Sequence, residues 1–329
     1  MKDFPPESQL KAHITQLVEQ ASARIQPYLR LTPVEYSYYL SHISQNHVYL
    51  KLENFQLTGS FKIRGALNKI LSLGDKIHQT KLLTASSGNH GAAFAWCVRQ
   101  FKLKGEIFLP QTVPTNKVEQ LQLMGVSFRL TGNDCVIAEL QAKEEARKKG
   151  YIFISPYNDW QIIAGQGTIG LELSQQIPAI EAVFVPVGGG GLISGLAGYL
   201  KNHSPSVKII GCQPENSAVM YHSLQAGEIL DLPSHPTISD GTAGGIDKEA
   251  LTFPICQALV DEFVLLKEEE ILAAVKLLLE KHHLLIEGAG ALSVAAFLKT
   301  QTQYKNQSIV LILSGARLSP DILQKIYSA

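Results

Sequence analysis

Cysteine is scarce in this chain of 329 residues, and its placement excludes two classes of cross-linked scaffold. The four cysteines, Cys97, Cys135, Cys212 and Cys256, lie far apart, and no C-x-x-C pair occurs. A disulfide framework or a zinc ribbon needs closely spaced pairs, so neither is predicted and we expect no metal site. A chain of this length buries enough surface to form a core without cross-links. We expect a cytoplasmic protein.

The sequence also lacks an excess of charge of either sign, with 29 basic and 29 acidic side chains. Proteins that bind nucleic acids or anionic membranes usually carry a basic excess on one face. No apolar run approaches the roughly 20 residues that cross a bilayer, and no apolar segment follows the N-terminal charges. We therefore expect a small-molecule partner, no nucleic acid and no membrane.

Short β-branched apolar segments alternate with longer amphipathic segments from about residue 81 onward. Strands are predicted at 81–86, 106–110, 126–132, 151–155, 181–187, 207–214, 262–267 and 308–314. Helices are predicted at 89–103, 114–124, 134–149, 166–177, 191–201, 267–285 and 289–301. This alternation is typical of βαβ units and a mostly parallel sheet, which predicts the α/β class.

Eight strands exceed one compact sheet, so we expect two domains. The segment 81–158 contains four predicted strands and three predicted helices, enough for a small domain inserted into a larger one. The larger domain would then consist of residues 1–80 and 159–329. The stretch 228–254 is punctuated by Pro, Ser and Gly and predicts a long ordered loop.

Four consecutive glycines, Gly188 to Gly191, follow a predicted strand and precede a predicted helix. Unpaired NH groups at a helix N-terminus favour an anion, and glycine lets the backbone approach it closely, so this run predicts a phosphate site. Two other interpretations stay open. The run could be a flexible turn, or a near-match to a dinucleotide fingerprint, with Ser194 at its third glycine position and Glu215 ending the next strand.

The segment Ser86 to His90 lies between a predicted strand and a predicted helix. Serine and asparagine are frequent there as helix caps, which is a purely structural interpretation. The same donors at a helix start could hold the carboxylate of an amino-acid substrate. Both interpretations are compatible.

Lys62 lies between an aromatic residue and Arg64 in a helix-compatible stretch. Most lysines are solvated, and the residue type alone predicts a surface position. Partial burial next to Arg64 would lower its pKa and free the amine as a nucleophile, which a Schiff-base lysine requires.

Ser314 closes the last predicted strand. Open α/β sheets place their ligands at the carboxyl ends of strands, so its hydroxyl would project toward a ligand. The structural alternative is a serine that caps the following turn.

Four motifs, SFKIRGA (60–66), SSGNHGAA (86–93), PVGGGGLISG (186–195) and LSGA (313–316), occur in this order. Together they resemble the fold-type II pyridoxal-phosphate enzymes, in particular the serine/threonine dehydratase and serine racemase family. The resemblance implies two open twisted sheets with flanking helices, as in the tryptophan synthase β subunit. It also implies pyridoxal 5'-phosphate as cofactor, bound between a large domain and a small domain that closes over the substrate.

The resemblance also implies a role for individual residues. The cofactor would be held by Phe61, Lys62, Asn89, Gly188, Gly189, Gly190, Gly191, Leu192 and Ser314. The substrate carboxylate would be received by Ser86, Ser87, Gly88, Asn89 and His90. Lys62 would form a Schiff base and then act as catalytic base. The glycines would hold the phosphate, Asn89 would bond the phenolic oxygen, and Ser314 would bond the pyridine nitrogen.

The implied activity is a dehydratase that eliminates water from L-threonine or L-serine to give a 2-oxo acid and ammonia. A hydroxyl opposite the pyridine nitrogen does not keep that nitrogen protonated, which favours elimination over transamination. Serine racemase is the main alternative, with Ser87 as the second catalytic residue, because racemases place a serine there. A dehydratase for another 3-hydroxy amino acid and a β-replacement enzyme also stay open. Relatives are commonly homo-oligomers, dimers or tetramers.

Two departures from the family pattern and one match bear on the site. The last motif reads SGAR where relatives commonly have SGGN, which introduces Arg317. Gln213 and Val219 stand where racemase-like relatives place acids for a divalent cation. Glu287 matches an acid near the cofactor in relatives, but an acid ahead of a helix is also a common cap.

Overall fold

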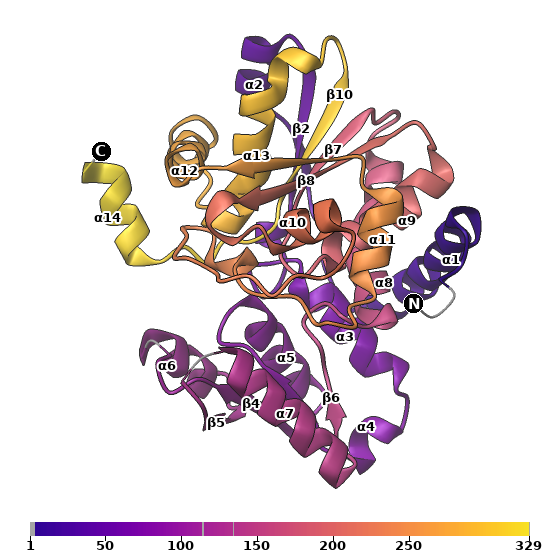
Figure 1. Ribbon diagram of the computed structural model, residues 1–329, viewed down its shortest axis with the longest axis vertical. Helices are drawn as coiled ribbons and strands as arrows, with labels where there is room; N and C mark the ends of the chain where they lie inside the picture. The colour runs from indigo at the N-terminus through magenta and orange to yellow at the C-terminus, as the bar shows by residue number, and fades with distance from the viewer. Residues whose placement is uncertain (1–3, 114, 134, 329) are drawn as a thin grey trace.

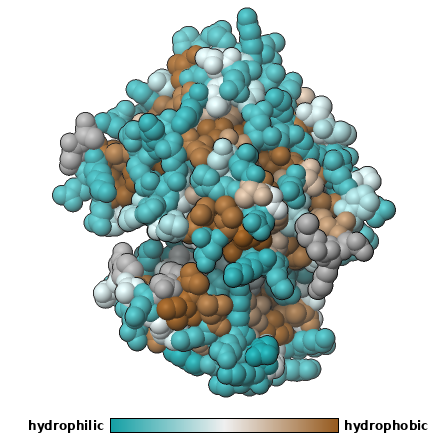
Figure 2. Space-filling view, viewed as in Figure 1, coloured by the Kyte–Doolittle hydropathy of each residue, from teal (hydrophilic) through white to brown (hydrophobic). Residues whose placement is uncertain are grey.

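The structure, a computed structural model, describes residues 4–113, 115–133 and 135–328. It consists of a larger lobe and a smaller lobe, each built on its own sheet (Figure 1). In the space-filling view the outline of the molecule is notched where the two lobes meet (Figure 2). None of the helices in the described ranges is long and apolar enough to cross a bilayer.

Six strands form the sheet of the larger lobe. In order across the sheet they are β1 (Val34–Tyr36), β2 (His47–Leu52), β10 (Ser308–Leu313), β7 (Ala182–Pro186), β8 (Lys208–Pro214) and β9 (Glu262–Leu266). The edge strand β1 runs antiparallel to β2, and the other neighbours are parallel.

Helices cover both faces of this sheet. On one face lie α2 (Tyr38–Ser44), α12 (Glu268–His282), α13 (Gly288–Thr300) and α14 (Pro320–Ser328). On the other lie α1 (Glu7–Ile25), α8 (Trp160–Gln176), α9 (Gly191–His203), α10 (Val219–Ala226) and α11 (Thr252–Leu259). Strand β10 therefore buries Ile309 and Leu311 on one face and Val310 and Ile312 on the other, so its sequence is a continuous apolar run.

The smaller lobe has four parallel strands. In order they are β5 (Ser127–Leu130), β4 (Gly105–Leu109), β3 (Leu82–Ala85) and β6 (Ile152–Phe153). On one face pack α3 (Lys62–Ser72), α4 (Lys76–Gln79), α5 (Asn89–Gln100) and α6 (Thr115–Leu123). On the other face packs α7 (Cys135–Lys149). Four short 3-10 turns complete the chain, η1 (Glu53–Phe55), η2 (Glu215–Ser217), η3 (Asp240–Thr242) and η4 (Gln301–Gln303).

The predicted α/β class with two sheets is confirmed, and each predicted strand and helix has a counterpart. Residues 114 and 134, which begin two predicted helices, lie outside the described residues. The stretch 228–254 is largely loop, as expected, with η3 in its centre and α11 entering at its end. All four strands of the smaller sheet lie within 81–158, but the boundary of the domain itself stays a prediction.

Glycine lets α3 and α8 touch backbone to backbone. A Cβ added at Gly65 would lie 2.9 Å from the carbonyl oxygen of Ile162, and one added at Gly165 would lie 2.6 Å from the Cα of Gly65. Real Cβ atoms do not come this close to backbone, so larger residues would force the helices apart. The first turn of α3, which begins with Lys62, is thereby held against α8.

A buried cluster of four charges fixes the same turn. The Arg64 guanidinium donates to Glu53 from Nε at 2.8 Å and to Glu172 from Nη1 at 2.6 Å. The Lys51 amine donates to the same Glu172 at 2.5 Å. Lys51 and Glu53 are fully buried and Arg64 is 1% exposed. Burial alone would raise the pKa of Glu53, but Arg64 outweighs it and the pKa is lowered, so the pair stays ionised.

We expect Glu53→Gln to lower the free energy of unfolding by about 3–5 kcal/mol, because it leaves the Arg64 charge buried with half its partners. Urea unfolding followed by circular dichroism measures the change. The control Lys11→Ala removes the partly exposed i,i+4 pair with Glu7 and should change stability by less than about 1 kcal/mol. Equal effects of the two substitutions would contradict the structural importance of the cluster.

Candidate active site

A narrow cavity lies where the two lobes meet, at the carboxyl ends of β7 and β10. It is lined by Phe61, Lys62, Asn89, Tyr157, Pro186, Gly188, Gly189, Gly190, Gly191, Leu192, Gly241, Thr242, Glu287, Ala289 and Ser314. All nine residues predicted to hold a cofactor are among them. Segments far apart in the sequence therefore meet at the edge where parallel sheets bind ligands.

Strand-like pairing places Lys62 beside Ser314. Ser60 forms an antiparallel bridge with Gly315, and the Phe61 amide donates to the Ser314 carbonyl at 3.1 Å. Lys62 then begins α3, whose position is fixed by Arg64 and the glycine contact with α8. The short link between the bridge and the helix leaves the lysine side chain at the cavity wall.

The Lys62 amine is held without an acidic partner. Its Nζ donates to the Pro156 carbonyl at 2.9 Å and lies 5.3 Å from the centre of the Phe61 ring. Burial lowers the pKa of Lys62 from 10.5 to about 8, although the charges of Glu287 and Glu139 raise it in part. The neutral, nucleophilic fraction of the amine near physiological pH is therefore far larger than in a solvated lysine, although the protonated form still predominates.

The glycine run forms a close-fitting loop at the start of α9. Gly190 has a φ of 85°, a conformation that favours glycine, and it precedes the first helical residue. A Cβ on Gly189 would lie within 2.7 Å of three ring carbons of Tyr157, and one on Gly191 would lie 3.1 Å from the Tyr157 backbone. Because α9 begins here, its first NH groups have no helical partner and are available to an anion.

The segment from Ser86 to His90 lies at the start of α5, as predicted. The cap position is Gly88, and no side chain caps the helix, so the capping interpretation of the serines is wrong for this structure. Of the five residues, Asn89 lines the cavity. Its Oδ1 is buried and has no hydrogen-bond partner among the described residues.

His90 points away from the cavity wall and into the core of the smaller lobe. It is 2% exposed, and its Nε2 bonds the Ile154 carbonyl at 3.1 Å. Burial and the nearby charge of Lys62 lower the pKa of His90 to about 3, so the ring is neutral. A contact of this segment with a substrate carboxylate would therefore come from the hydroxyls and backbone amides rather than from a charged imidazole.

Ser314 follows β10 directly and is 2% exposed. It lines the cavity together with the residues of the glycine loop. Three residues later, Arg317 donates from Nη1 to Gln120 Oε1 on α6 at 2.9 Å. The arginine thus reaches the smaller lobe.

Sequence reasoning missed Tyr157, which packs on the glycine loop and accepts a hydrogen bond at its hydroxyl from the Asp247 amide at 2.8 Å. It also missed Thr242, whose backbone lies 3.1 Å from a Cβ added at Gly188. Neither residue belongs to a motif. Only their distance from the loop in space reveals them.

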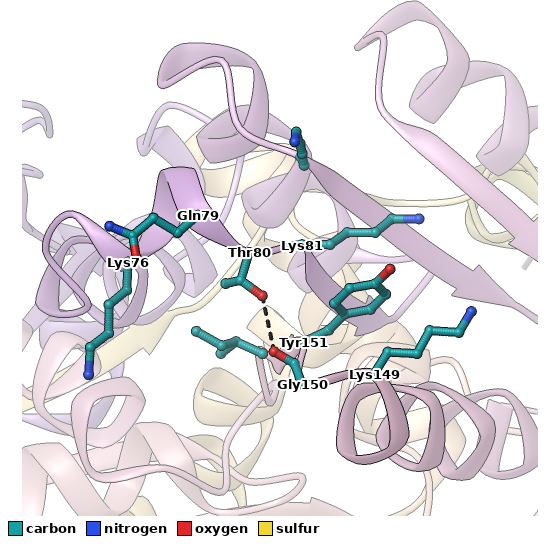
Figure 3. Close-up of a pocket in the computed structure, with 9 residues that line it drawn as sticks. Lys76, Gln79, Thr80, Lys81, Lys149, Gly150 and Tyr151 are labelled. Atoms are coloured by element: carbon teal, nitrogen blue, oxygen red, sulfur yellow. Dashed lines mark hydrogen bonds between the residues drawn. The ribbon is translucent and has the colours of Figure 1, made fainter.

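A second pocket lies at the far end of the smaller lobe and includes four lysines. It is lined by Lys76, Gln79, Thr80, Lys81, Lys104, Lys149, Gly150, Tyr151 and Ile152. Figure 3 shows Lys76 on one side of the Thr80–Gly150 hydrogen bond and Lys81 and Lys149 on the other, with the amine of Lys76 directed away from the other two. Lys81 pairs with Glu106 at 2.9 Å and Lys149 with Glu145 at 3.0 Å, so two of the four lysine charges are compensated.

The family of the chain follows from its match to a family model. The model described as "Pyridoxal-phosphate dependent enzyme" matches residues 25–315, a span that contains every residue of the cavity wall. The chain belongs to this family. Its cofactor is pyridoxal phosphate.

Known relatives and solved structures extend this result. An L-threonine ammonia-lyase of Thermotoga maritima is 38% identical over 310 residues, which cover 94% of this chain and 77% of that protein. The processed form of threonine deaminase isoform 2 from Solanum lycopersicum is 34% identical with a TM-score of 0.91, covering 96% and 88% of the two chains. Maize serine racemase is also 34% identical, with a TM-score of 0.88 and coverage of 95% and 97%.

The cavity fits this cofactor on three physical grounds. The glycine loop at the start of α9 leaves no room for a Cβ at Gly189, and a loop of bare backbone amides suits the binding of a phosphate. Lys62 supplies an amine with a lowered pKa, which suits a Schiff base with an aldehyde. Asn89 lines the same cavity, and its side-chain NH₂ group can donate to an oxygen of a ligand that fills the space between them.

We expect Lys62 in the cofactor-depleted protein to react with acetic anhydride at half-maximal rate near pH 8, the value to which burial lowers its pKa. Brief labelling followed by peptide mass spectrometry measures the rate. Free Nα-acetyl-lysine amide, labelled in parallel, corrects for reagent hydrolysis. A half-maximal pH close to 10.5 would show that the amine is not desolvated.

Proposed function

We propose that the protein is a pyridoxal-phosphate-dependent threonine/serine dehydratase, an ammonia-lyase that converts L-threonine or L-serine to a 2-oxo acid and ammonia. The observation that carries this proposal is the Lys62 amine with a pKa of about 8 at the wall of a cavity that a glycine cradle and Ser314 complete. The 38% identical relative is an L-threonine ammonia-lyase, which supports the substrate class. A dehydratase for another 3-hydroxy amino acid remains an alternative.

We propose that four sets of groups, in addition to Ser314, hold the cofactor. The cofactor, when bound, withdraws electrons from the substrate Cα. Lys62 would anchor it, and the amides of Gly188, Gly189, Gly190, Gly191 and Leu192 would hold its phosphate. Asn89 would donate to its phenolic oxygen, and Phe61 would pack near its ring. The helix start of α9 supplies the positive field for the phosphate without a basic side chain.

Ser314 would face the pyridine nitrogen with a neutral hydroxyl. A hydroxyl exchanges a hydrogen bond but carries no charge, so it does not stabilise a protonated ring as a carboxylate would. The charge that develops at the substrate Cα is then relieved by expelling the β-hydroxyl. This supports elimination over transamination.

The Lys62 amine would move the proton of the reaction. Once released from the cofactor, Nζ is a neutral base with a pKa near the working pH, the condition under which proton abstraction from Cα is efficient. Its bond to the Pro156 carbonyl at 2.9 Å limits the positions that Nζ can take. The neutral His90 does not compete for this proton.

The substrate carboxylate would bind at the start of α5. Ser86, Ser87 and the first amides of α5 offer donors there, and the helix dipole favours a negative charge. The Gly88 amide lies 3.3 Å from the Ser86 hydroxyl, which orders the loop. Gly91 lets the first turn of α5 lie directly against Ser86, because a Cβ at this position would lie 3.0 Å from the Ser86 carbonyl carbon.

Residues 81–158, which carry all four strands of the smaller sheet, would act as the domain that closes over the substrate. Two ion pairs that join it to the larger lobe support this assignment. Lys143 on α7 bonds Asp247 at 2.7 Å, and Lys117 on α6 bonds Asp240 at 3.2 Å. Closure would exclude water from the cavity while Lys62 moves its proton.

Serine racemisation is the second candidate, because maize serine racemase is as similar in sequence as the threonine deaminase. It requires a second proton-transfer group on the face opposite Lys62, and Ser87 would be that group. The ratio of racemised to dehydrated product would depend on whether Ser87 delivers a proton to the substrate Cα before the β-hydroxyl leaves.

We also propose a cytoplasmic homo-oligomer. Cys97, Cys212 and Cys256 are buried and free, as in a reducing compartment, and the side chain of Cys135 lies outside the described part of the chain. Large apolar side chains on the surface, such as Leu31 at 67% and Tyr38 at 82% exposure, support burial against another copy.

We expect Lys62→Ala to remove the visible absorption of the bound cofactor and to lower turnover of L-threonine and L-serine by at least the 10²- to 10⁴-fold, roughly, that a general base contributes. A coupled assay for 2-oxo acids measures turnover. The exposed Lys76 supplies the control Lys76→Ala, which should behave as wild type. Formation of D-serine without 2-oxo acid would favour the racemase and contradict the dehydratase.

We expect Gly189→Ala to weaken equilibrium binding of pyridoxal phosphate by about tenfold, because the new methyl group collides with the Tyr157 ring and overpacking costs about 1–3 kcal/mol. Fluorescence titration of cofactor-depleted protein measures the affinity. Gly245→Ala is the control, since a Cβ there meets nothing within 4 Å. Unchanged affinity in Gly189→Ala would exclude the loop as the phosphate site.

A further inference from the structure

Glu287 occupies the cap position of α13 but does not cap it. Its side chain accepts no hydrogen bond from the free amides of that helix. It is only 3% exposed and lines the cavity. Burial of a carboxylate costs free energy unless its oxygens are bonded, so its other partners must explain its position.

Two donors from different segments hold this carboxylate. Asn89 at the start of α5 donates from Nδ2 to Oε1 at 2.7 Å, and the backbone amide of Arg317 donates to Oε2 at 3.0 Å. Gly315 makes room for it, because a Cβ there would lie 2.9 Å from the carboxylate carbon. The Glu287 carboxylate thus joins the smaller lobe to the loop that follows β10.

The bond to Glu287 determines which end of the Asn89 amide faces which way. An ionised carboxylate only accepts, so the NH₂ end of the amide must point to Glu287. The Oδ1 end then points elsewhere, and it is buried without a partner among the described residues. One N–H of Nδ2 bonds Glu287, and because Asn89 lines the cavity, the second could serve an acceptor there.

We propose that Glu287 is a positioning residue that locks the Asn89 amide with its second N–H presented to the phenolic oxygen of the cofactor. The inference rests on the proposed contact of Asn89 with that oxygen. Without the carboxylate the amide can turn over and present Oδ1, which repels a phenolic oxygen. Glu287 would therefore act on the cofactor without touching the reacting atoms.

The orientation of the Asn89 amide should depend on pH, because it depends on the protonation of Glu287 and on the charged groups around this residue. Burial and the charge of Asp240 on η3 raise the pKa of Glu287, and its net value is about 7. The bonds from Asn89 and Arg317 lower it, and the Lys62 ammonium on α3 also faces it. Below this pH the protonated carboxyl can donate to Oδ1, so the amide loses its fixed orientation.

The first experiment follows the side-chain amide resonance of Asn89 in the full-length protein by ¹⁵N NMR, assigned by its absence in Asn89→Ala. In the wild type it should titrate with a midpoint near pH 7, and in Glu287→Gln this titration should disappear. The control Glu269→Gln removes an exposed acid at the start of α12 and should leave the titration unchanged. The same midpoint in Glu287→Gln would overturn the proposal.

The second experiment is a double-mutant cycle on cofactor affinity and on the visible band of the holoenzyme. Glu287→Gln and Asn89→Ala should each weaken affinity by about tenfold and shift the band, as expected for loss of a hydrogen bond to a charged group. The double variant should match Asn89→Ala alone, because Glu287 acts through Asn89. Additive losses, roughly a hundredfold together, would overturn the proposal.

The two experiments separate this inference from the proposed function. If Asn89→Ala leaves affinity and band unchanged, the contact between Asn89 and the cofactor is wrong. If the amide titration nevertheless depends on Glu287, the conclusion that Glu287 orients the Asn89 amide is retained. If the two substitutions are non-additive in cofactor affinity and Lys62→Ala retains turnover, Glu287 acts through Asn89 but Lys62 is not the catalytic base.

Discussion

Two cations and two carboxylates buried beneath α3 form the constraint on which the position of Lys62 depends. Arg64 stands two residues after Lys62 and bonds Glu53 and Glu172 with all sides of its guanidinium. Removing four ions from water costs several kcal/mol for each, so the cluster is retained only with its partners in place. It joins the end of β2, the turn η1, α3 and α8. A shift in any of these would move the lysine at the cavity wall.

The cavity itself uses few charges for a site that holds anions. The helix starts of α5 and α9 supply amide donors, and the backbone around Gly189 is pressed against Tyr157. The overall balance of charge agrees with the proposal, because no basic surface is needed if the start of α9 receives the phosphate and the start of α5 receives the carboxylate. Lys62, with no acidic partner in hydrogen-bond contact, stays available as a base.

The sequence predicted those parts of the fold and site whose cause is local. Buried parallel strands such as β10 carry apolar residues on both faces, and helix starts after glycine or serine are visible in the chain. The strands β1 and β2 and the helix α1 were not predicted, because their short or weakly periodic segments are fixed by pairing with β10 and packing on α8. Tyr157 and the role of Glu287 also escaped, since only tertiary contact distinguishes a cavity residue from a turn residue or a cap.

The pairing of β2 with β10 has a consequence for the order in which the protein is made. Six residue pairs join His47–Leu52 to Ser308–Leu313, across more than 250 positions of the chain. The smaller sheet, by contrast, is complete within residues 82–153. During synthesis the smaller lobe can assemble while the larger sheet still lacks its central strand. Until β10 is synthesised, the strand edges of β2 and β7 that pair with it therefore have no partner.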